Sequence, residues 1–285
     1  MWIDGELLIP LDGSSLAENA LPLAATVVGA LDRPVRLLHI VSDYEGELTS
    51  TDVDRARELF REYGEKALRD CGISLDRARI DVDHGSPATR ILAAAEHAAA
   101  IVIATHGRGG FRANIIGSVA DKVIRGAQVP IFVAPGTAYK AVGPSQERPV
   151  LVALDGSEAA ETALQYARDF AKGINAKVVL LQAYHVPPTV GIEFAYYPAD
   201  YAYTLETAAR EYLAEIVQPG EESFVVYAEA ANAIVEVAHR LDAGLVVMAS
   251  SGKGLARRLA LGSVTDRVVH SIHRPLLIIP AGAEA

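Results

Sequence analysis

The sequence predicts an α/β protein that consists of two tandem domains, each a doubly wound, five-stranded parallel sheet with helices on both faces. Three observations lead to this fold class. The chain has 285 residues, which is enough for two domains of ordinary size. The second half repeats the pattern of the first. Within each half, short apolar runs alternate with amphipathic segments of helical spacing, which is typical of parallel sheets buried on both faces.

The repeat is clearest in two pairs of segments. Residues 7–24 read LLIPLDGSSLAENALPLA and residues 150–167 read VLVALDGSEAAETALQYA, and ten of these 18 positions are identical. The segments 105–135 and 250–280 form the second pair, each with a Gly-Ser-Val triplet at the same place. A period of about 144 residues is too long for a solenoid, so each copy is expected to be a domain with its own core.

The domains are predicted at residues 1–140 and 146–285, and the linker at 136–149 is rich in Gly, Pro and polar residues. In the first half, apolar and β-branched runs predict strands at 7–11, 35–41, 78–83, 101–105 and 131–134. Helical spacing and good helix formers predict helices at 15–31, 52–71, 88–99 and 118–127. In the second half the same pattern predicts strands at 150–154, 176–183, 223–228, 245–249 and 276–279. Right-handed crossovers then place a ligand-binding crevice at the carboxyl ends of the strands.

The loop after the fourth strand of each half is the first candidate site. A glycine follows the strand (Gly107, Gly252), and after nine intervening residues a Gly-Ser pair stands where the last helix begins. Glycine lets backbone N–H groups approach a phosphate closely, and a helix start adds unpaired N–H groups and a positive dipole end. The alternative is a tight turn with a serine N-cap and no ligand. Basic residues in these loops favour an anion, namely Arg108, Arg112, Lys253, Arg257 and Arg258.

The end of the first strand is the second candidate site. Asp12 and Asp155 each stand at the carboxyl end of a strand and are followed by Gly-Ser. In this position a carboxylate faces the crevice and can accept hydrogen bonds from a ribose hydroxyl or a base. Each aspartate could instead be the N-cap of the following helix, or serve both purposes.

These motifs, together with Gly-Ser-Pro-Ala at residues 85–88, resemble the universal stress protein family, once per half and over essentially the whole chain. The resemblance implies a Rossmann-like sheet of the adenine-nucleotide α-hydrolase type. It also implies, in one branch of the family, ATP binding through G-x2-G-x9-G-(S/T), with the first-strand aspartate and an aliphatic residue that ends the second strand near the adenosine. The implied binding positions are Asp12, Ile40, Ala104, Gly107, Gly117, Ser118 and Val119 in the first half, and Asp155, Ala183, Ala249, Gly252, Gly262, Ser263 and Val264 in the second.

Both halves depart from the motif at its first glycine, where Ala104 and Ala249 stand. If that position requires a positive φ, alanine costs roughly 1–2 kcal/mol; if it requires only a small side chain, alanine is nearly neutral. The second half also has Ala-Asn-Ala at residues 231–233 in place of Gly-x-Pro-Ala. Because Ala183 offers less apolar wall than Ile40, the first site is expected to bind better than the second.

Other features of the sequence carry weaker expectations. The segment 186–203, VPPTVGIEFAYYPADYAY, is either a lid or contact surface or a loop whose aromatic residues pack on their own domain. His106 lies in the phosphate loop and could contact an anion. The histidines are scattered and Cys71 is the only cysteine, so neither a metal site nor a disulfide is expected.

The net charge of −10 opposes binding to a nucleic acid backbone. The N-terminus lacks the pattern of a signal peptide and no apolar run is long enough to span a membrane, so a cytoplasmic protein is expected. The last strand of each half is expected at a sheet edge, where the two halves could pair with each other and leave other surfaces for a homodimer.

The function expected from the sequence is a stress-response regulatory protein that binds ATP, with or without Mg²⁺, and has little or no catalytic activity. The phosphate loop has no acid of its own, and the chain has no Walker-type P-loop, so a positioned base or an acid-held metal ion is not evident. The alternatives are a slow ATPase or phosphotransferase that uses Asp12 or Asp155, and a nucleotide-free assembly protein.

Overall fold

The computed structural model describes residues 2–42, 50–105, 116–136, 145, 147–186, 200–251 and 261–283. The ten strands of these residues form one sheet in the order β3-β2-β1-β4-β5-β10-β9-β6-β7-β8. The strands of the first half are β1 (Leu7–Pro10), β2 (Val35–Val41), β3 (Ala78–His84), β4 (Ala100–Ala104) and β5 (Ile131–Ala134). Those of the second half are β6 (Val150–Leu154), β7 (Val178–Tyr184), β8 (Glu222–Tyr227), β9 (Leu245–Ala249) and β10 (Leu276–Ile279).

All strand pairs within a half are parallel, whereas β5 and β10 pair antiparallel, with Phe132 opposite Leu277. The expected α/β fold with two five-stranded parallel sheets is confirmed. The expectation that the halves pair through their last strands is also confirmed. Because each edge would otherwise expose unpaired N–H and C=O groups, joining the two edges satisfies both at once.

Helices cover both faces of the sheet. They are α1 (Ala20–Leu31), α2 (Ser50–Asp70), α3 (Pro87–Ala95), α4 (Ser118–Gly126), α5 (Glu158–Gly173), α6 (Tyr201–Ile216), α7 (Ala230–Arg240) and α8 (Ser263–Ser271). The core on one face takes its helical residues from α1, α2, α5 and α6, and the core on the other face from α3, α4, α7 and α8. None of the helices in the described part of the chain has both the length and the apolarity that crossing a lipid bilayer requires.

All four helices of the first half differ from their predicted bounds, two of them by more than two residues at one end. The predicted helix 15–31 opens with a short 3-10 turn, Ala17–Asn19, before α1 begins. The predicted helix 88–99 ends at Ala95, because the N–H group of Ala99 donates to the Glu6 carbonyl 2.9 Å away and β4 begins at the next residue. Alanine favours a helix locally, but pairing with the N-terminal segment decides the conformation here.

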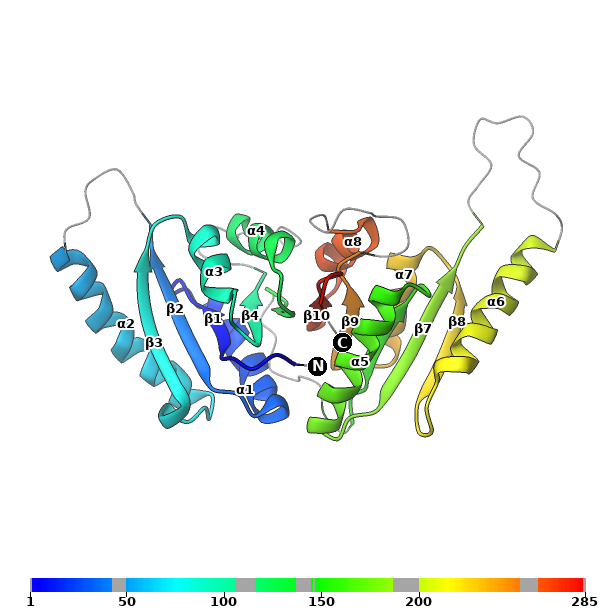
Figure 1. Cartoon of the computed structure of the whole chain (residues 1–285), viewed down its shortest axis with the longest axis horizontal. Helices are drawn as coiled ribbons and strands as arrows, with labels where there is room; N and C mark the ends of the chain where they lie inside the picture. Colours follow the sequence, from blue (N-terminus) through cyan, green and yellow to red (C-terminus); the bar gives the residue numbers. More distant parts are fainter. Residues whose placement is uncertain are drawn as a thin grey trace, which may run out of the picture.

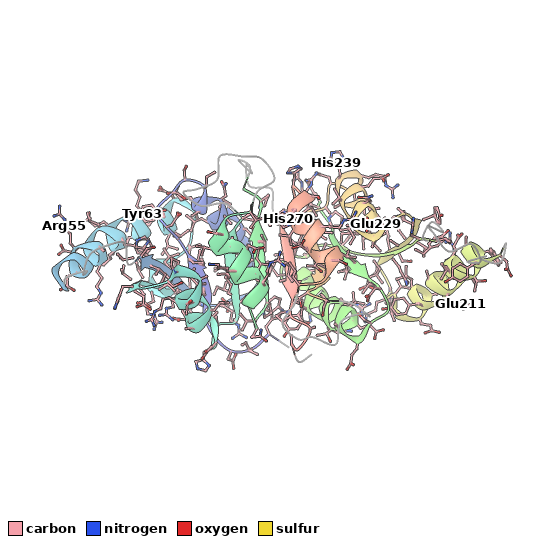
Figure 2. The ribbon with its side chains drawn as sticks, turned by 90° about the horizontal axis from the view of Figure 1, so that it is seen from above. Arg55, Tyr63, Glu211, Glu229, His239 and His270 are labelled. Carbon is pink, nitrogen blue, oxygen red and sulfur yellow. The ribbon has the colours of Figure 1, made fainter. Side chains whose placement is uncertain are left out.

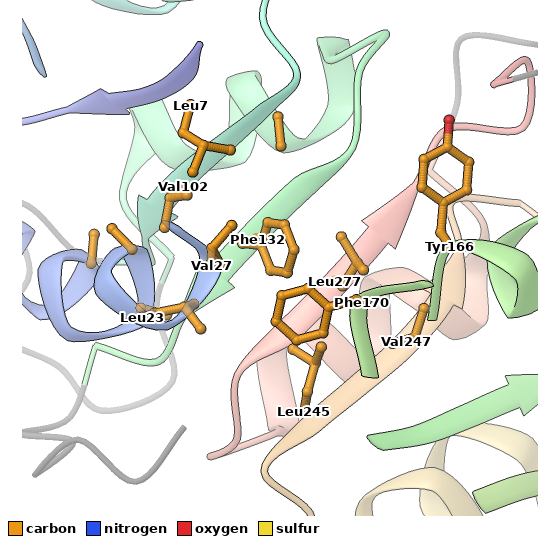
Figure 3. Packing of buried hydrophobic residues seen from close by; sticks show 14 of the residues in the cluster. Leu7, Leu23, Val27, Val102, Phe132, Tyr166, Phe170, Leu245, Val247 and Leu277 are labelled. Atoms are coloured by element: carbon orange, nitrogen blue, oxygen red, sulfur yellow. The ribbon is translucent and has the colours of Figure 1, made fainter. Parts of the chain in front are cut away.

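The two halves share a hydrophobic core across the β5–β10 seam (Figure 3). Phe132 of β5 lies 5.2 Å from the Phe170 ring of α5 and 5.8 Å from Trp2, measured between ring centroids. The indole of Trp2 also meets the ring of Tyr166 edge to face at 4.9 Å. The N-terminal segment of the first half therefore packs against a helix of the second.

Candidate functional site

Each half of the sheet has one switch point, where the connections that follow two neighbouring strands run in opposite directions. β1 lies between β2 and β4, and β6 lies between β7 and β9. In open parallel sheets, ligands bind at such a switch point, beyond the carboxyl ends of the strands. The chain places Asp12 after β1 and the β4–α4 loop after β4, and it places Asp155 and the β9–α8 loop in the same way in the second half.

The aspartate after the first strand of each half belongs to a tight turn. The Asp12 carboxylate accepts hydrogen bonds from the Ser14 N–H (2.9 Å) and the Ser14 hydroxyl (2.6 Å), around Gly13 with φ of 78°. The Asp155 carboxylate accepts from the Ser157 N–H at 3.0 Å, and Ser157 itself is the N-cap of α5, accepting from Ala160. The interpretation of Asp155 as the N-cap is therefore wrong, because the serine two residues later takes that role. Both aspartates are half-buried, just beyond the carboxyl ends of β1 and β6.

The helices that follow the phosphate-loop segments begin at a glycine. Gly117 and Gly262 are the N-caps of α4 and α8, with φ of −61° and −63°. Their N–H groups donate to the carbonyls of Thr105 and Ser250, both at 2.7 Å. A Cβ atom on Gly262 would stand 3.2 Å from that Ser250 oxygen, so glycine favours the close approach here and does not serve a positive φ.

Ser118 and Ser263 are consequently the first helical residues, and the interpretation of either as an N-cap is wrong. Both are exposed. The first i→i−4 bond of α4 runs from the Asp121 N–H to the Gly117 carbonyl (2.9 Å). The three N–H groups before it therefore have no acceptor within the helix, which is the geometry that favours an anion.

Ala104 and Ala249, which replace the first motif glycine, are the last residues of β4 and β9. They pair in register with Ala134 and Ile279 and are buried. Among the described residues, the non-glycine positions with positive φ are Asp32, Asn175 and Asp242. Alanine at the motif position is thus a small buried strand residue without backbone strain, the second of the two alternatives that the sequence left open.

The walls beside the two crevices differ. In the first half, Ile40 is half-buried against the core under α3 and α4, and the neighbouring His39 stacks on Phe60 at 4.8 Å and contacts the Leu11 carbonyl through Nδ1 at 2.8 Å. In the second half, Ala183 follows Gln182, whose side-chain oxygen is buried without a hydrogen bond among the described residues. The first half therefore has a larger aliphatic side chain, Ile40, at the position where the second half has Ala183.

The end of β7 carries a contact that sequence reasoning missed. The Tyr184 hydroxyl donates to Glu206 of α6 at 2.8 Å, and Glu206 also accepts from Arg210. Burial and the hydrogen bond to Glu206 raise the pKa of Tyr184. The Tyr184 ring also meets the exposed Tyr227 edge to face at 5.3 Å. The tyrosines in this part of the sequence could have pointed to a contact here, but the sequence does not show that the partner is Glu206, which lies on a separate helix.

A second missed feature joins the starts of α4 and α8. Arg125 donates to Asp121 of its own helix at 2.9 Å and to Asp266 of α8 at 2.5 Å. The two aspartates occupy the same place in their helices, so the duplication was the signal that could have identified them. Their common partner lies at the far end of α4.

Several predicted positions of the candidate sites lie outside the residues that the structure describes. They are Gly107, Gly252, His106, the loop residues Arg108, Arg112, Lys253, Arg257 and Arg258, and most of the aromatic segment 186–203.

A groove of about 450 Å³ lies between α7 and α8, lined by residues such as Asn232, Glu236 and His270. None of the predicted binding positions is among its lining residues.

Comparison with known proteins agrees with the duplicated architecture. The model of the universal stress protein family matches the chain twice, over residues 5–135 and 147–280. A universal stress protein of Mycolicibacterium smegmatis is 25% identical over 299 residues, with 96% of each chain covered. One from Methanocaldococcus jannaschii is 30% identical over 148 residues, covering 48% of this chain and 84% of that relative.

Among solved structures, the crystal structure of a universal stress protein from Archaeoglobus fulgidus has a TM-score of 0.72 at 20% sequence identity, covering 97% of this chain and 98% of the other. At this identity the likeness concerns the fold. The two family matches together span most of the chain, and their residues contain both switch points and both glycine-capped helices. This chain therefore belongs to the universal stress protein family, as a member with two tandem copies of the family domain.

Proposed function

We propose that this protein is a stress-response regulator of the cytoplasm that binds ATP in one or both crevices and has little or no catalytic activity. The observation that supports this most directly is a juxtaposition that occurs twice. An aspartate turn (Asp12, Asp155) ends one strand, and the connection from the adjacent strand leads into a helix with outward-facing N–H groups. A nucleoside phosphate matches this pairing, because its ribose hydroxyls are donors and its phosphates are anions.

The phosphate side of the site rests on α4 and α8. Several hydrogen bonds from backbone N–H groups to a charged oxygen contribute roughly 1.5–3 kcal/mol each, and the positive end of the helix dipole adds to them. The hydroxyls of Ser118 and Ser263 are exposed at the same helix ends and can donate to a phosphate oxygen. If Mg²⁺ accompanies the nucleotide, Asp12 and Asp155 are the carboxylates best placed to meet it, and the ion would neutralise phosphate charge.

Little catalysis is expected because the acidic groups near these helix ends are already engaged. Asp121 and Asp266 are held by Arg125, and Asp12 and Asp155 accept hydrogen bonds within their own turns. Phosphoryl transfer needs a base that orients the attacking group. A carboxylate that maintains a turn or an ion pair is poorly placed for that task.

The test separates the two crevices. We expect purified protein, denatured and analysed by ion exchange, to release adenine nucleotide, and the emptied protein to bind ATP by calorimetry. Ile40→Trp is expected to abolish binding in the first crevice and Ala183→Trp in the second, because each fills the wall beside the strand end. Leu59→Trp, on an exposed position of α2, is the control and should leave binding unchanged.

The outcomes discriminate between the candidate functions. ATP binding that is lost with one or both crevice variants but kept in the control supports the proposal. Bound ADP together with turnover of added ATP would instead favour the slow ATPase. If the purified protein releases no adenine nucleotide and the emptied protein does not bind added ATP, nucleotide binding is refuted.

We also propose a homodimer. The β5 and β10 edges are paired with each other, so the outer edges β3 and β8 or a helical face would form the contact between two chains. Light scattering coupled to size-exclusion chromatography should give twice the 30.3 kDa chain mass. A mass of one chain at all concentrations would refute the dimer.

A further inference from the structure

The two helices whose N-termini border the two crevices lie next to each other. Figure 2 shows α4 and α8 side by side at the centre of one face, with His270 near the seam between them. Figure 1 shows the same two helices facing each other above the β5–β10 seam. The structural elements that would hold phosphate in the two halves are therefore neighbours, although they are about 145 residues apart in sequence.

A single cation connects the first turns of these helices. Arg125 Nε donates to the Asp121 carboxylate at 2.9 Å, and Arg125 Nη2 donates to the Asp266 carboxylate at 2.5 Å. The backbone N–H of Asp121 closes the first helical bond of α4 onto Gly117, and that of Asp266 closes the first bond of α8, at 2.9 and 2.8 Å. Both carboxylates thus sit one turn from a helix N-terminus.

The charges at this place have opposing effects on an anion. A carboxylate in the first turn stabilises a helix by interacting with its dipole, but it repels a phosphate that binds at the same terminus. A guanidinium bonded to both carboxylates offsets that repulsion in both halves. Partial burial lowers the pKa of Arg125, but the hydrogen bonds to Asp266 and Asp121 outweigh this effect and raise it, so the group stays charged.

The arrangement is asymmetric, although the duplication would allow a symmetric one. His270 occupies in α8 the position that Arg125 has in α4. Its Nδ1 atom contacts the Asp266 backbone carbonyl of its own helix at 2.7 Å. The cation shared by the two helix starts is therefore supplied by the first half alone.

We propose that Arg125 is a positioning residue for both nucleotide sites, holding the first turns of α4 and α8 together and neutralising the carboxylate that lies one turn from each helix N-terminus. This inference rests on the proposed ATP binding. It extends that function by making the affinity of the second crevice depend on a residue of the first half. It also links the two sites, since a phosphate at either helix start acts on the same cation.

The decisive measurement isolates the second crevice. ATP is titrated into the Ile40→Trp protein, whose first crevice is blocked, with and without Arg125→Gln. We expect Arg125→Gln to weaken binding about 3- to 10-fold at about 10 mM salt, where charges act over roughly 30 Å, and much less at 1 M salt. Lys122→Gln removes the same charge from an exposed position of the same helix and should change second-crevice affinity less than 2-fold.

A compensating variant distinguishes charge from general damage to the fold. Arg125→Gln combined with Asp266→Asn removes the cation and the carboxylate in the first turn of α8. We expect the double variant to regain most of the lost affinity, because the repulsion is gone. Loss of affinity without recovery in the double variant, or an equal loss with Lys122→Gln, would overturn the electrostatic role.

A readout without nucleotide keeps this inference separate from the proposed function. Arg125→Gln should speed hydrogen exchange of the amides that make the first intrahelical bonds of α8, at residues 266–269, while Lys122→Gln should not. Faster exchange in a protein that binds no ATP would support the link between the helices and refute only the nucleotide proposal. Unchanged exchange together with unchanged second-crevice affinity would overturn the inference.

Discussion

Replacing Gly173 with alanine tests whether the two halves form one packed unit. Gly173 ends α5 and corresponds, across the duplication, to Ala30 of α1. A Cβ atom added at Gly173 would stand 2.2 Å from the Ala30 carbonyl oxygen and 2.9 Å from its carbonyl carbon. Because these atoms are backbone, the clash can be relieved only if α1 and α5 move apart.

The expected magnitude is the balance of two effects. Alanine in place of glycine favours a helix by up to about 1 kcal/mol, and less at a helix end. Overpacking against a rigid neighbour costs roughly 1–3 kcal/mol. We expect Gly173→Ala to lower the free energy of unfolding by about 1–2 kcal/mol, measured by urea denaturation followed by circular dichroism. Gly29→Ala, with no atom within 4 Å of the added Cβ, should be neutral or stabilising.

A double variant tests the origin of the clash. In Ala30→Gly/Gly173→Ala the small side chain is only exchanged between the helices, while the Ala30 carbonyl stays in place. We expect the double variant to be no more stable than Gly173→Ala. If Gly173→Ala is as stable as the wild type, or if the exchange restores stability, the close backbone contact between the halves is not as described.

Three further predictions concern other parts of the chain. Arg168 donates to both carboxylate oxygens of Glu221 at 2.7 Å, and the two side chains are only 14% and 9% exposed. Arg168→Met should therefore lower the free energy of unfolding by about 3 kcal/mol, because it leaves the Glu221 charge unpaired. Arg168→Met/Glu221→Leu should cost less, because no unpaired charge is left. Burial raises the pKa of the Cys71 thiol, so its reaction with a disulfide reagent at pH 8 should be slow in native protein and rapid in denaturant; equal rates would contradict this. Gly262→Ala should shift the start of α8 and weaken ATP binding in the second crevice, whereas calorimetry should show the first crevice unchanged.

Much of the fold could be predicted from the sequence, because the signals involved are local. Five strands were predicted to the residue, namely β2, β5, β6, β9 and β10, since each is a short apolar run bounded by polar or turn residues. At β7 the prediction began two residues early. There the Ala176 N–H bonds back to Ala171 at the end of α5, so the strand begins only at Val178.

The candidate site was predicted in part. The positions of the aspartate turns and of the last helix in each half followed from repeated motifs, and Ala104 and Ala249 stand as strand residues without strain. The roles of the small residues were mistaken, however. A serine cap of the last helix was one of two alternatives, but glycine is the cap, and at Gly262 an added Cβ would lie only 3.2 Å from the Ser250 carbonyl oxygen.

What the sequence alone determined about this protein is the duplicated domain and the succession of strands and helices along each half, since periodicity and repetition are written along the chain. Tertiary structure decided the antiparallel β5–β10 seam, the contact of Gly173 with Ala30, and the position of Arg125 between two aspartates. These features depend on which surfaces meet after folding. Residues more than a hundred positions apart then come into contact and interact through packing and charge, and local sequence patterns do not show which residues these are.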